Sequence, residues 1–295
     1  MNLESTSLGV VIIHYGRSKP TQQCLQSVLE DPSAVERHIA VVDNFGNLKP
    51  EEFTGCTILV HRPDNPGFGG GANAGVDALK TTADCLGFVV MNNDLVINPG
   101  FLDSAAEALE PHDVGAVGGP ILVGFDQPTL WYAGGVIRRL TGTVRQSHSE
   151  VDASSRHDVG FVPGTAIAVR ADAWFEINGF DTSYFLYNED IDLCLRLQRN
   201  GRRLLFEPGM SCLHDLGETT GSSHRSALYL EQITRTRLRP FRPRAYQIYL
   251  GAVHTLYNIA RILRLFLRHG RSARTQIRAI IRGHIGALAE VIQPR

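Results

Sequence analysis

The sequence places a carboxylate and two side-chain amides next to each other, directly after an apolar, strand-like run. These residues are Asn92, Asn93 and Asp94. A carboxylate with amide oxygens beside it suits a hard divalent cation such as Mg²⁺ or Mn²⁺, and such a cation would also bind the oxygens of a diphosphate. A turn without a metal is the plain alternative, because Asn and Asp favour turns.

A second acidic segment begins a predicted helix. Glu189, Asp190 and Asp192 are three carboxylates within four residues, and Tyr184 and Tyr187 precede them. Crowded carboxylates raise one another's pKa, which is useful in a general base. The alternative is purely structural, because each acidic residue in a first turn favours the helix dipole by about 0.3–1 kcal/mol. The residues alone leave both interpretations open.

The third candidate is a glycine-rich turn, NPGFGGGAN, at residues 65–73. It follows a strand, opens a helix and matches the GxGxxG/A spacing of dinucleotide-binding loops. At least two strands precede it, however, and no acidic residue ends the next strand at the expected distance. We therefore favour a loop whose glycines let the backbone approach a ligand over a nicotinamide or flavin site. The last candidate is His214, which we regard as a metal ligand only if Asp94 binds a metal.

These segments lie within an alternation of strands and helices. Apolar runs predict strands at residues 10–14, 38–42, 57–60 and 87–91, with helices beginning near Ser18, Ala72 and Pro99. Such alternation predicts an α/β fold with a mostly parallel, Rossmann-like sheet covered on both faces. Asp43-Asn44 and residues 92–94 directly follow strands, at the edge where open α/β sheets hold their ligands.

The remaining chain is organised differently. The pattern predicts a hairpin or loop pair at residues 131–146, and a strand at 164–170 that enters a helix at 171–177. It also predicts a helix at 190–199 and a short strand at 203–207. Beyond residue 221 the chain is helical and arginine-rich. We therefore expect one domain over residues 1–221 and a basic helical extension over residues 222–295.

Composition fits a folded protein with an uneven charge distribution. The 295 residues are 43% hydrophobic and carry a net charge of −1, yet residues 225–295 hold 14 basic and 2 acidic side chains. Five scattered cysteines without CxxC spacing favour a reducing compartment. We see no signal peptide and no uninterrupted apolar run of about 18 residues. We therefore expect a cytoplasmic protein, peripheral at the inner face of the cell membrane.

The arginines of the extension recur every three or four residues, which predicts a single stripe on one helix. They are Arg261, Arg264, Arg268, Arg271, Arg274, Arg278 and Arg282, and Tyr249, Val253, Leu256, Ala260, Leu263 and Leu267 lie opposite. This amphipathic pattern predicts contact with an anionic membrane surface. A helix packed on the domain with a solvated basic face is the alternative. Nucleic acid is not expected, because no aromatic stacking platform accompanies the arginines.

Together these segments resemble the family-2 glycosyltransferases, which are inverting enzymes of the GT-A fold, and within them the rhamnosyltransferases of surface-polysaccharide assembly. The similar segments run from about residue 10 to residue 221. They are VVIIHYGR at 10–17, VVDN at 41–44, NPGFGGGANAG at 65–75, MNNDLVINPGFL at 91–102, GTAIAVR at 164–170 and GFDTSYFLYNEDIDLCLRLQRNGRRLLFEPGMSCLHDLG at 179–217.

The resemblance implies a role for each candidate. Residues 92–94 occupy the place of the metal-binding DxD motif, with Asn92 where the first Asp stands, so that Asp94 is the main metal ligand and His214 completes the site. Asp190 matches the catalytic base. The residues expected to bind or orient the nucleotide sugar are His14, Tyr15, Asp43, Asn65, Gly67, Gly69, Asn73, Asn92, Asn93 and Glu189.

The resemblance therefore implies a metal-dependent, inverting glycosyltransferase that uses Mg²⁺ or Mn²⁺. The donor would be a nucleotide-diphosphate sugar, dTDP-rhamnose first and a UDP-sugar next, and the acceptor a glycan or a polyprenyl-diphosphate-linked sugar. The QxxRW motif of processive synthases is absent from the sequence, so we expect one sugar to be added. A sugar nucleotidyltransferase, an inactive nucleotide- or glycan-binding protein and an oxidoreductase remain alternatives.

Overall fold

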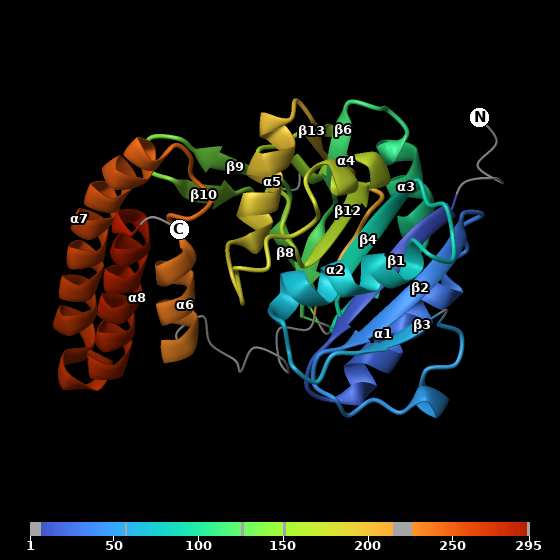
Figure 1. The fold of residues 1–295 in the computed structure, drawn as a ribbon, viewed down its shortest axis with the longest axis horizontal. Helices are drawn as coiled ribbons and strands as arrows, with labels where there is room; N and C mark the ends of the chain where they lie inside the picture. Colours follow the sequence, from blue (N-terminus) through green and yellow to red (C-terminus); the bar gives the residue numbers. More distant parts are fainter. Residues whose placement is uncertain (1–6, 57, 125–126, 150–151, 215–225, 294–295) are drawn as a thin grey trace.

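The computed structural model describes residues 7–56, 58–124, 127–149, 152–214 and 226–293. An eight-stranded sheet forms its centre, with strand order β11-β13-β6-β12-β4-β1-β2-β3 (Figure 1). In chain order these strands are β1 (Ser7–His14), β2 (Glu36–Asp43), β3 (Ile58–His61), β4 (Gly87–Asn92), β6 (Val114–Gly118), β11 (His157–Asp158), β12 (Ala166–Arg170) and β13 (Arg203–Phe206). Strands β4, β1, β2 and β3 are parallel, as is the β6–β13 pair, whereas β12 runs antiparallel to both of its neighbours.

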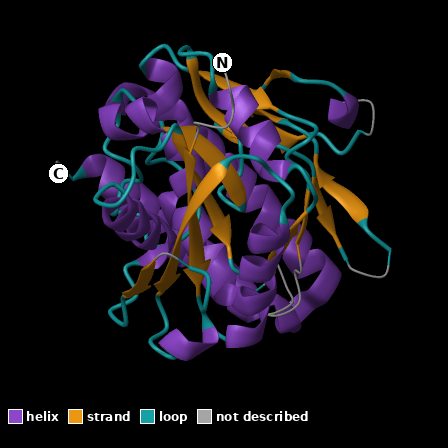
Figure 2. Cartoon of the chain, turned by 90° about the vertical axis from the view of Figure 1, so that its right-hand side faces the viewer, coloured by secondary structure: helices purple, strands orange, loops and turns teal. Residues whose placement is uncertain are grey.

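Helices cover both faces of this sheet. All eight residues of β1 are buried, although their side chains alternate between the two faces. The helices of this part are α1 (Ser18–Glu30), α2 (Gly67–Leu79), α3 (Phe101–Leu109), α4 (Ala171–Glu176) and α5 (Glu189–Arg199), and Figure 2 shows them around the strands. Helix α2 lies close to the sheet at Gly75, where a Cβ would stand 2.4 Å from Cγ1 of Val11. The predicted mostly parallel α/β sheet is confirmed.

Element boundaries differ from the sequence prediction in a few places. Helix α2 begins at Gly67 rather than near Ala72, because the glycines at 67–71 that were expected in a turn are themselves helical. Helix α3 begins at Phe101, after Gly100 with φ of 85°. A four-stranded second sheet was not predicted. It has the order β5-β14-β7-β8, formed by β5 (Leu95–Ile97), β7 (Ile121–Val123), β8 (Thr129–Tyr132) and β14 (Cys212–His214).

The predicted hairpin region contributes β8 to this second sheet, and β9 (Gly135–Arg138) pairs with β10 (Thr143–Gln146) as a separate antiparallel hairpin. The tip of this hairpin meets the C-terminal helices, because a Cβ at Gly142 would lie 2.8 Å from Cδ1 of Leu250. The hairpin therefore joins the sheet-bearing part of the chain to the helical part.

Three helices form the C-terminal part: α6 (Ala227–Thr236), α7 (Arg244–His269) and α8 (Arg274–Ile292), with a 3-10 turn at Gly270–Ala273 (Figure 1). Gly270 ends α7 with φ of 52°. The prediction of one arginine stripe on one helix is therefore wrong. Arg261, Arg264 and Arg268 lie on α7, whereas Arg274, Arg278 and Arg282 lie on α8.

The C-terminal helices pack closely on one another. A Cβ at Gly283 of α8 would lie 2.4 Å from the carbonyl oxygen of Glu231 in α6, so glycine permits this approach.

The boundary that we predict at residue 221 falls outside the described residues. In the described part of the chain, no helix combines the length and the apolar character needed to cross a membrane.

Candidate active site

Three of the predicted site residues lie side by side at the carboxyl ends of parallel strands. His14 of β1 is in register with Asp43 of β2, and Ile13 is in register with Asn92 of β4. Because parallel strands end at the same edge of a sheet, residues far apart in the sequence meet there. The structure thus brings this group of predicted residues together.

His14 and Asp43 are both buried at this edge. His14 Nδ1 lies 2.6 Å from Thr21 Oγ1, and its Nε2 lies 2.7 Å from Asn47 Oδ1. The Asp43 carboxylate accepts backbone N–H groups from Phe45, Gly46 and Leu48 at 2.6–3.0 Å. Burial alone would raise the pKa of Asp43, but these N–H groups outweigh it and hold the pKa below its ordinary value. Asp43 therefore shapes the loop after β2 as a fixed negative charge.

Two aromatic side chains lie just after the ends of β1 and β2. Tyr15 and Phe45 are each about half exposed, 45% and 49%, and their ring centroids lie 5.0 Å apart in an edge-to-face arrangement. Sequence reasoning named Tyr15 but missed Phe45. Its position directly after Asp43-Asn44, in the loop that follows the second parallel strand, was the available signal. The pair offers an apolar surface beside the buried polar residues.

Asp94 and His214 form the predicted metal pair. His214 Nε2 lies 3.1 Å from Asp94 Oδ1, both side chains are buried, and His214 pairs with Leu95 in the β14–β5 ladder. His214 Nδ1 is buried and meets no hydrogen-bond partner among the described residues. Asn93 turns elsewhere, because its Nδ2 donates to Thr21 Oγ1 at 2.9 Å.

This donor set fits a divalent cation only in part. No group of three or more His, Cys, Asp or Glu that could hold a metal occurs within the described ranges. An oxygen donor and an imidazole nitrogen are nevertheless suitable ligands, and Mg²⁺ is commonly held by one or two protein groups together with substrate phosphates and water. Asp94 and His214 therefore fit a cation that is completed by a bound diphosphate.

The glycine-rich turn packs against the protein's own backbone. Gly67 has φ of 79°, and a Cβ there would lie 2.1 Å from the carbonyl oxygen of Phe185. A Cβ at Gly69 would lie 2.8 Å from Cβ of Phe180, and Asn73 both donates to and accepts from the Phe180 backbone at 2.8 and 2.9 Å. At these positions, the close approach that glycine permits is to residues 180–185 of the same chain.

Asn65 begins this turn. Its φ is 45°, and its Oδ1 accepts the N–H of Gly67 at 3.3 Å. The local hydrogen bond favours the left-handed backbone that leads into α2, since Asn tolerates this conformation better than most residues. The turn therefore connects the carboxyl edge of the sheet to the segment that precedes Glu189-Asp190.

Asp190 is linked to the same edge through two backbone groups. Its Oδ2 accepts the N–H of Gly164 at 3.1 Å, and the carbonyl oxygen of the next residue, Thr165, accepts the N–H of Asn92 at 3.0 Å. Residues 164 and 165 thus lie between the candidate base and the strand that ends at the candidate metal segment. The sequence contained GTAIAVR as a strand-like run but no signal for this bridging role.

The electrostatics of the Glu189-Asp190 pair suit proton uptake. Burial raises the pKa of Asp190, although the N–H groups of Gly164 and Ile191 oppose the rise. Burial, and then the neighbouring charge of Asp190, raise the pKa of Glu189. Glu189 Oε2 is buried without a hydrogen-bond partner in the described part of the chain. Asp192 differs, because Arg196 donates to its Oδ2 at 2.6 Å and gives it a structural partner.

The family comparison covers much of this site. A sequence model of the family described as "Glycosyl transferase family group 2" matches residues 87–281, about two thirds of the chain. The chain belongs to this family. The family match includes the candidate base and metal segments and continues through α6 and α7 into α8. The predicted family-2 resemblance is confirmed.

Named relatives of this family-2 chain include rhamnosyltransferases. The N-acetylglucosaminyl-diphospho-decaprenol L-rhamnosyltransferase of Mycobacterium tuberculosis is 28% identical over 198 residues, which are 66% of this chain and 59% of that protein. Rhamnosyltransferase WbbL of Escherichia coli K12 is 45% identical over 56 residues, 19% of this chain and 21% of WbbL. The family-2 chain thus matches only part of the length of each relative.

Solved structures show the same fold. A mannosyltransferase from Pyrobaculum calidifontis in complex with GDP-Man and Mn²⁺ has a TM-score of 0.55 at 16% identity, covering 97% of this chain and 89% of that one. GalNAc-T7 with UDP, GalNAc and Mn²⁺ has a TM-score of 0.59 at 14% identity, covering 78% and 47%. At these identities the likeness concerns the fold, and the predicted GT-A fold is confirmed.

Proposed function

We propose that this family-2 protein transfers one sugar from a nucleotide-diphosphate donor to a hydroxyl group of a glycan or lipid-linked acceptor, with inversion at the anomeric carbon. The observation that carries the proposal is the backbone bridge of Gly164 and Thr165. It places the Asp190 carboxylate beside the strand that leads to the Asp94–His214 pair. A base and a site for a diphosphate at one sheet edge are the two parts that sugar transfer needs.

In the proposed reaction, Asp190 accepts the proton of the acceptor hydroxyl while that oxygen attacks the anomeric carbon. The new carbon–oxygen bond forms as the bond to the nucleotide diphosphate breaks, and the diphosphate leaves from the opposite face, so the configuration inverts. A positioned base accounts for about 10²–10⁴-fold in rate. A divalent cation, Mg²⁺ or Mn²⁺, held by Asp94 and His214 would offset charge on the departing diphosphate.

We assign the remaining candidates by their placement. The exposed Tyr15–Phe45 pair would contact the nucleoside, and buried His14 and Asp43 would support this surface. Asn92 and Glu189 would orient the donor, and Asn93 would hold α1 at this edge through its hydrogen bond to Thr21. Asn65, Gly67, Gly69 and Asn73 would hold the segment before the base against α2.

The names of the relatives support a proposal for the donor and the acceptor. Two of them are named rhamnosyltransferases, which supports dTDP-rhamnose as the first donor to test and UDP-sugars as the next. The name of the mycobacterial relative specifies N-acetylglucosaminyl-diphospho-decaprenol as the molecule that receives rhamnose. We therefore propose a polyprenyl-diphosphate-linked sugar as the acceptor, in surface-polysaccharide assembly at the inner face of the cell membrane.

Thermal unfolding with nucleotides tests the donor site. We expect dTDP or UDP species to raise the melting temperature only when Mn²⁺ or Mg²⁺ is present, since a ligand at 100 times its Kd stabilises by about 2.7 kcal/mol. Asp94→Asn should abolish the metal dependence. Asp77→Asn, an exposed carboxylate on α2, is the matched control and should behave as wild type. Stabilisation by NAD(P) or nucleoside triphosphates alone would instead overturn the glycosyltransferase proposal.

We also propose that α7 docks on an anionic membrane surface. Apolar side chains recur along its exposed face at alternating intervals of three and four residues: Tyr249, Ala252, Leu256, Ile259, Leu263 and Phe266. Leu250 and His254, on the opposite face, are buried against the rest of the protein. Helix α7 contains no acidic residue, and the sole one in α8 is Glu290. The net positive charge of α7 and α8 complements anionic lipid, whereas a second copy of α7 would bring like charges together.

Vesicle flotation tests this surface. We expect binding to vesicles of phosphatidylcholine and phosphatidylglycerol, and at least tenfold weaker binding to phosphatidylcholine alone. Leu256→Glu with Leu263→Glu should abolish binding, because it places two charges on the apolar face. Leu228→Glu alters a similarly exposed leucine on α6 and should not. A wild-type dimer in sedimentation equilibrium, dissociated by the α7 variant, would favour a second copy as the partner of this face.

A further inference from the structure

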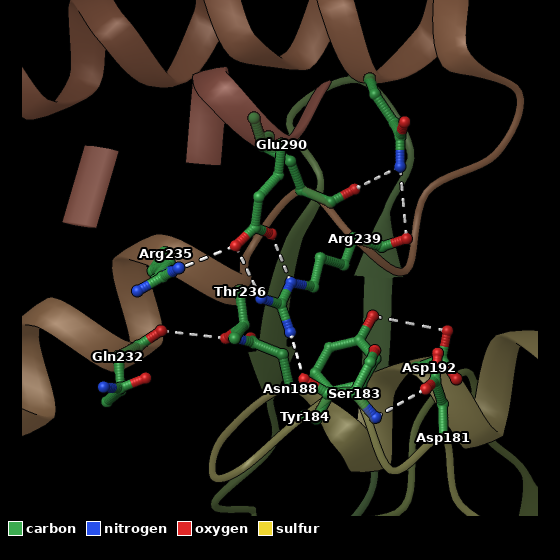
Figure 3. Close-up of polar contacts among 12 residues, drawn as sticks. Asp181, Ser183, Tyr184, Asn188, Asp192, Gln232, Arg235, Thr236, Arg239 and Glu290 are labelled. Atoms are coloured by element: carbon green, nitrogen blue, oxygen red, sulfur yellow. Dashed lines mark hydrogen bonds and ion pairs between the residues drawn. The ribbon is translucent and has the colours of Figure 1, made fainter. Parts of the chain in front are cut away.

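We propose that helix α6 is part of the catalytic apparatus, because it clamps the segment that leads into Asp190, and that Thr236 is the positioning residue of this clamp. The inference rests on the proposed function for the role of Asp190. It concerns a part of the chain that sequence patterning assigned to a separate extension. Figure 3 shows the contacts between the two parts.

The clamped segment has an unusual backbone just before the base. Tyr187 and Asn188 both have φ of 69°, in the left-handed region, which Asn tolerates better than most residues but which a tyrosine rarely adopts. Two consecutive residues of this kind persist only where the surroundings determine them. Asn188 is the residue before α5, and its side chain does not cap that helix. The local sequence therefore does not by itself account for this conformation.

Helix α6 supplies the missing constraint. Asn188 Nδ2 donates to Thr236 Oγ1 at 2.7 Å and to the carbonyl oxygen of Ile233 at 3.2 Å. Thr236 Oγ1 in turn lies 2.9 Å from each of two carbonyl oxygens, that of Tyr187 and that of Gln232 in its own helix, and its one proton is shared between them. One buried hydroxyl thus contacts both left-handed residues, and Figure 3 shows its contact with Asn188. The Tyr187 ring also meets the Tyr229 ring of α6 edge-to-face, with centroids 4.9 Å apart.

A second contact holds the start of the same segment. Arg239 donates to the carbonyl oxygen of Ser183 at 2.6 Å, and its guanidinium lies 5.3 Å from the centre of the Tyr184 ring. Glu290 of α8 holds Arg239 through two hydrogen bonds, of 2.5 and 2.7 Å (Figure 3). The segment is therefore held at Ser183–Tyr184 and again at Tyr187–Asn188, so that its path to Asp190 is determined from both ends.

Thr234, two residues before Thr236 in α6, provides a matched control. Both hydroxyls are buried in α6, with 2% exposure of each residue. Thr234 Oγ1 donates to the carbonyl oxygen of Leu230 within the same helix. Replacing either threonine with valine removes one buried hydroxyl with almost no change in shape. Thr236→Val alone removes the contact with the segment before Asp190.

We expect Thr236→Val to lower kcat for sugar transfer at least tenfold while the KM for the donor changes less than threefold. Thr236→Ser, which keeps the hydroxyl, should restore kcat, and Thr234→Val should retain wild-type kcat. Amide hydrogen exchange of residues 183–191 should accelerate at least tenfold in Thr236→Val and not in Thr234→Val. Equal kcat and equal exchange in the two valine variants would overturn the inference.

The exchange measurement keeps this inference distinct from the proposed function. It uses the full chain and needs no substrate. If the wild-type protein showed no sugar transfer, the proposed function would fail, while accelerated exchange in Thr236→Val would still establish the clamp. If transfer were observed but exchange and kcat were unaffected by Thr236→Val, the clamp would fail and the proposed function would stand.

Discussion

Replacing Asp190 with asparagine is expected to lower kcat for sugar transfer by about 10²–10⁴-fold, the range that a positioned general base contributes. The amide keeps the size of the side chain and can still accept the N–H of Gly164, so the loop geometry is preserved. Donor binding should therefore change by less than about threefold, measured as the nucleotide-dependent shift in melting temperature in the presence of Mn²⁺. Initial rates with a radiolabelled donor give kcat.

The pH dependence of kcat should identify the same group. A base acts in its deprotonated form, and burial raises the pKa of Asp190 above the ordinary value of an aspartate. The kcat of the wild-type protein should thus rise with pH, and the apparent pKa of this rise should lie above the normal aspartate value. Because Glu189 and Asp190 interact, this apparent pKa belongs to the pair. The residual rate of Asp190→Asn should lack this rise.

Asp192→Asn is the control for this substitution. It makes the same chemical change two residues further along α5, at a carboxylate whose partner is Arg196. We expect kcat within about tenfold of wild type and a lower melting temperature, because the partner of Arg196 is weakened. An Asp190→Asn protein with more than a tenth of the wild-type kcat would falsify the base assignment.

Replacing Gly67 with alanine should both destabilise the protein and stop sugar transfer. The backbone at Gly67 has φ of 79°, which costs an alanine about 1–2 kcal/mol. In addition, the new Cβ would stand 2.1 Å from the carbonyl oxygen of Phe185, so one of the two segments must move. We expect a total loss of about 3 kcal/mol or more in the free energy of unfolding, and a melting temperature that falls by roughly 6 °C or more.

Gly201 provides a control with the same backbone conformation. Its φ is 78°, and nothing lies within 4 Å of the position that a Cβ would take. Gly201→Ala should therefore show the backbone cost alone, and it should keep its transferase activity. The difference in melting temperature between the two variants measures the contact with Phe185. Equal melting temperatures, or an active Gly67→Ala protein, would contradict the packing that we describe between α2 and the segment before Asp190.

The strands and the carboxyl edge of the sheet were predictable because their signals are local. Short apolar, β-branched runs predicted β1 to β4, and the polar residues that follow these runs had to share one edge once the strands were parallel. Asp43, Asn44 and residues 92–94 were therefore identified together, whereas His14 came from the family resemblance. The Asp94–His214 contact came from family resemblance rather than from spacing, since the two residues lie 120 positions apart in the sequence.

Tertiary structure alone decided which segments the polar and glycine-rich residues contact. The glycines at 67 and 69 matched a ligand-binding loop in sequence, yet their nearest neighbours are Phe185 and Phe180. Periodicity likewise placed seven arginines on one stripe, but three of them lie on α7, three lie on α8, and Arg271 lies in the turn at Gly270–Ala273. A pattern of apolar residues specifies which face of an element is buried, but not the element that buries it.

Local residue patterns and their order were therefore enough to predict the parallel sheet, the edge that carries the site, and the family. Each of these depends on residue types within a few positions of one another, or on the order of such segments. The structure decided how Asp190 is held: by Gly164 from the sheet, and on the other side by Thr236 and Arg239 through the segment before it. Those contacts join residues 26 to 56 positions apart, and their formation depends on the packing of whole helices, which no local pattern encodes.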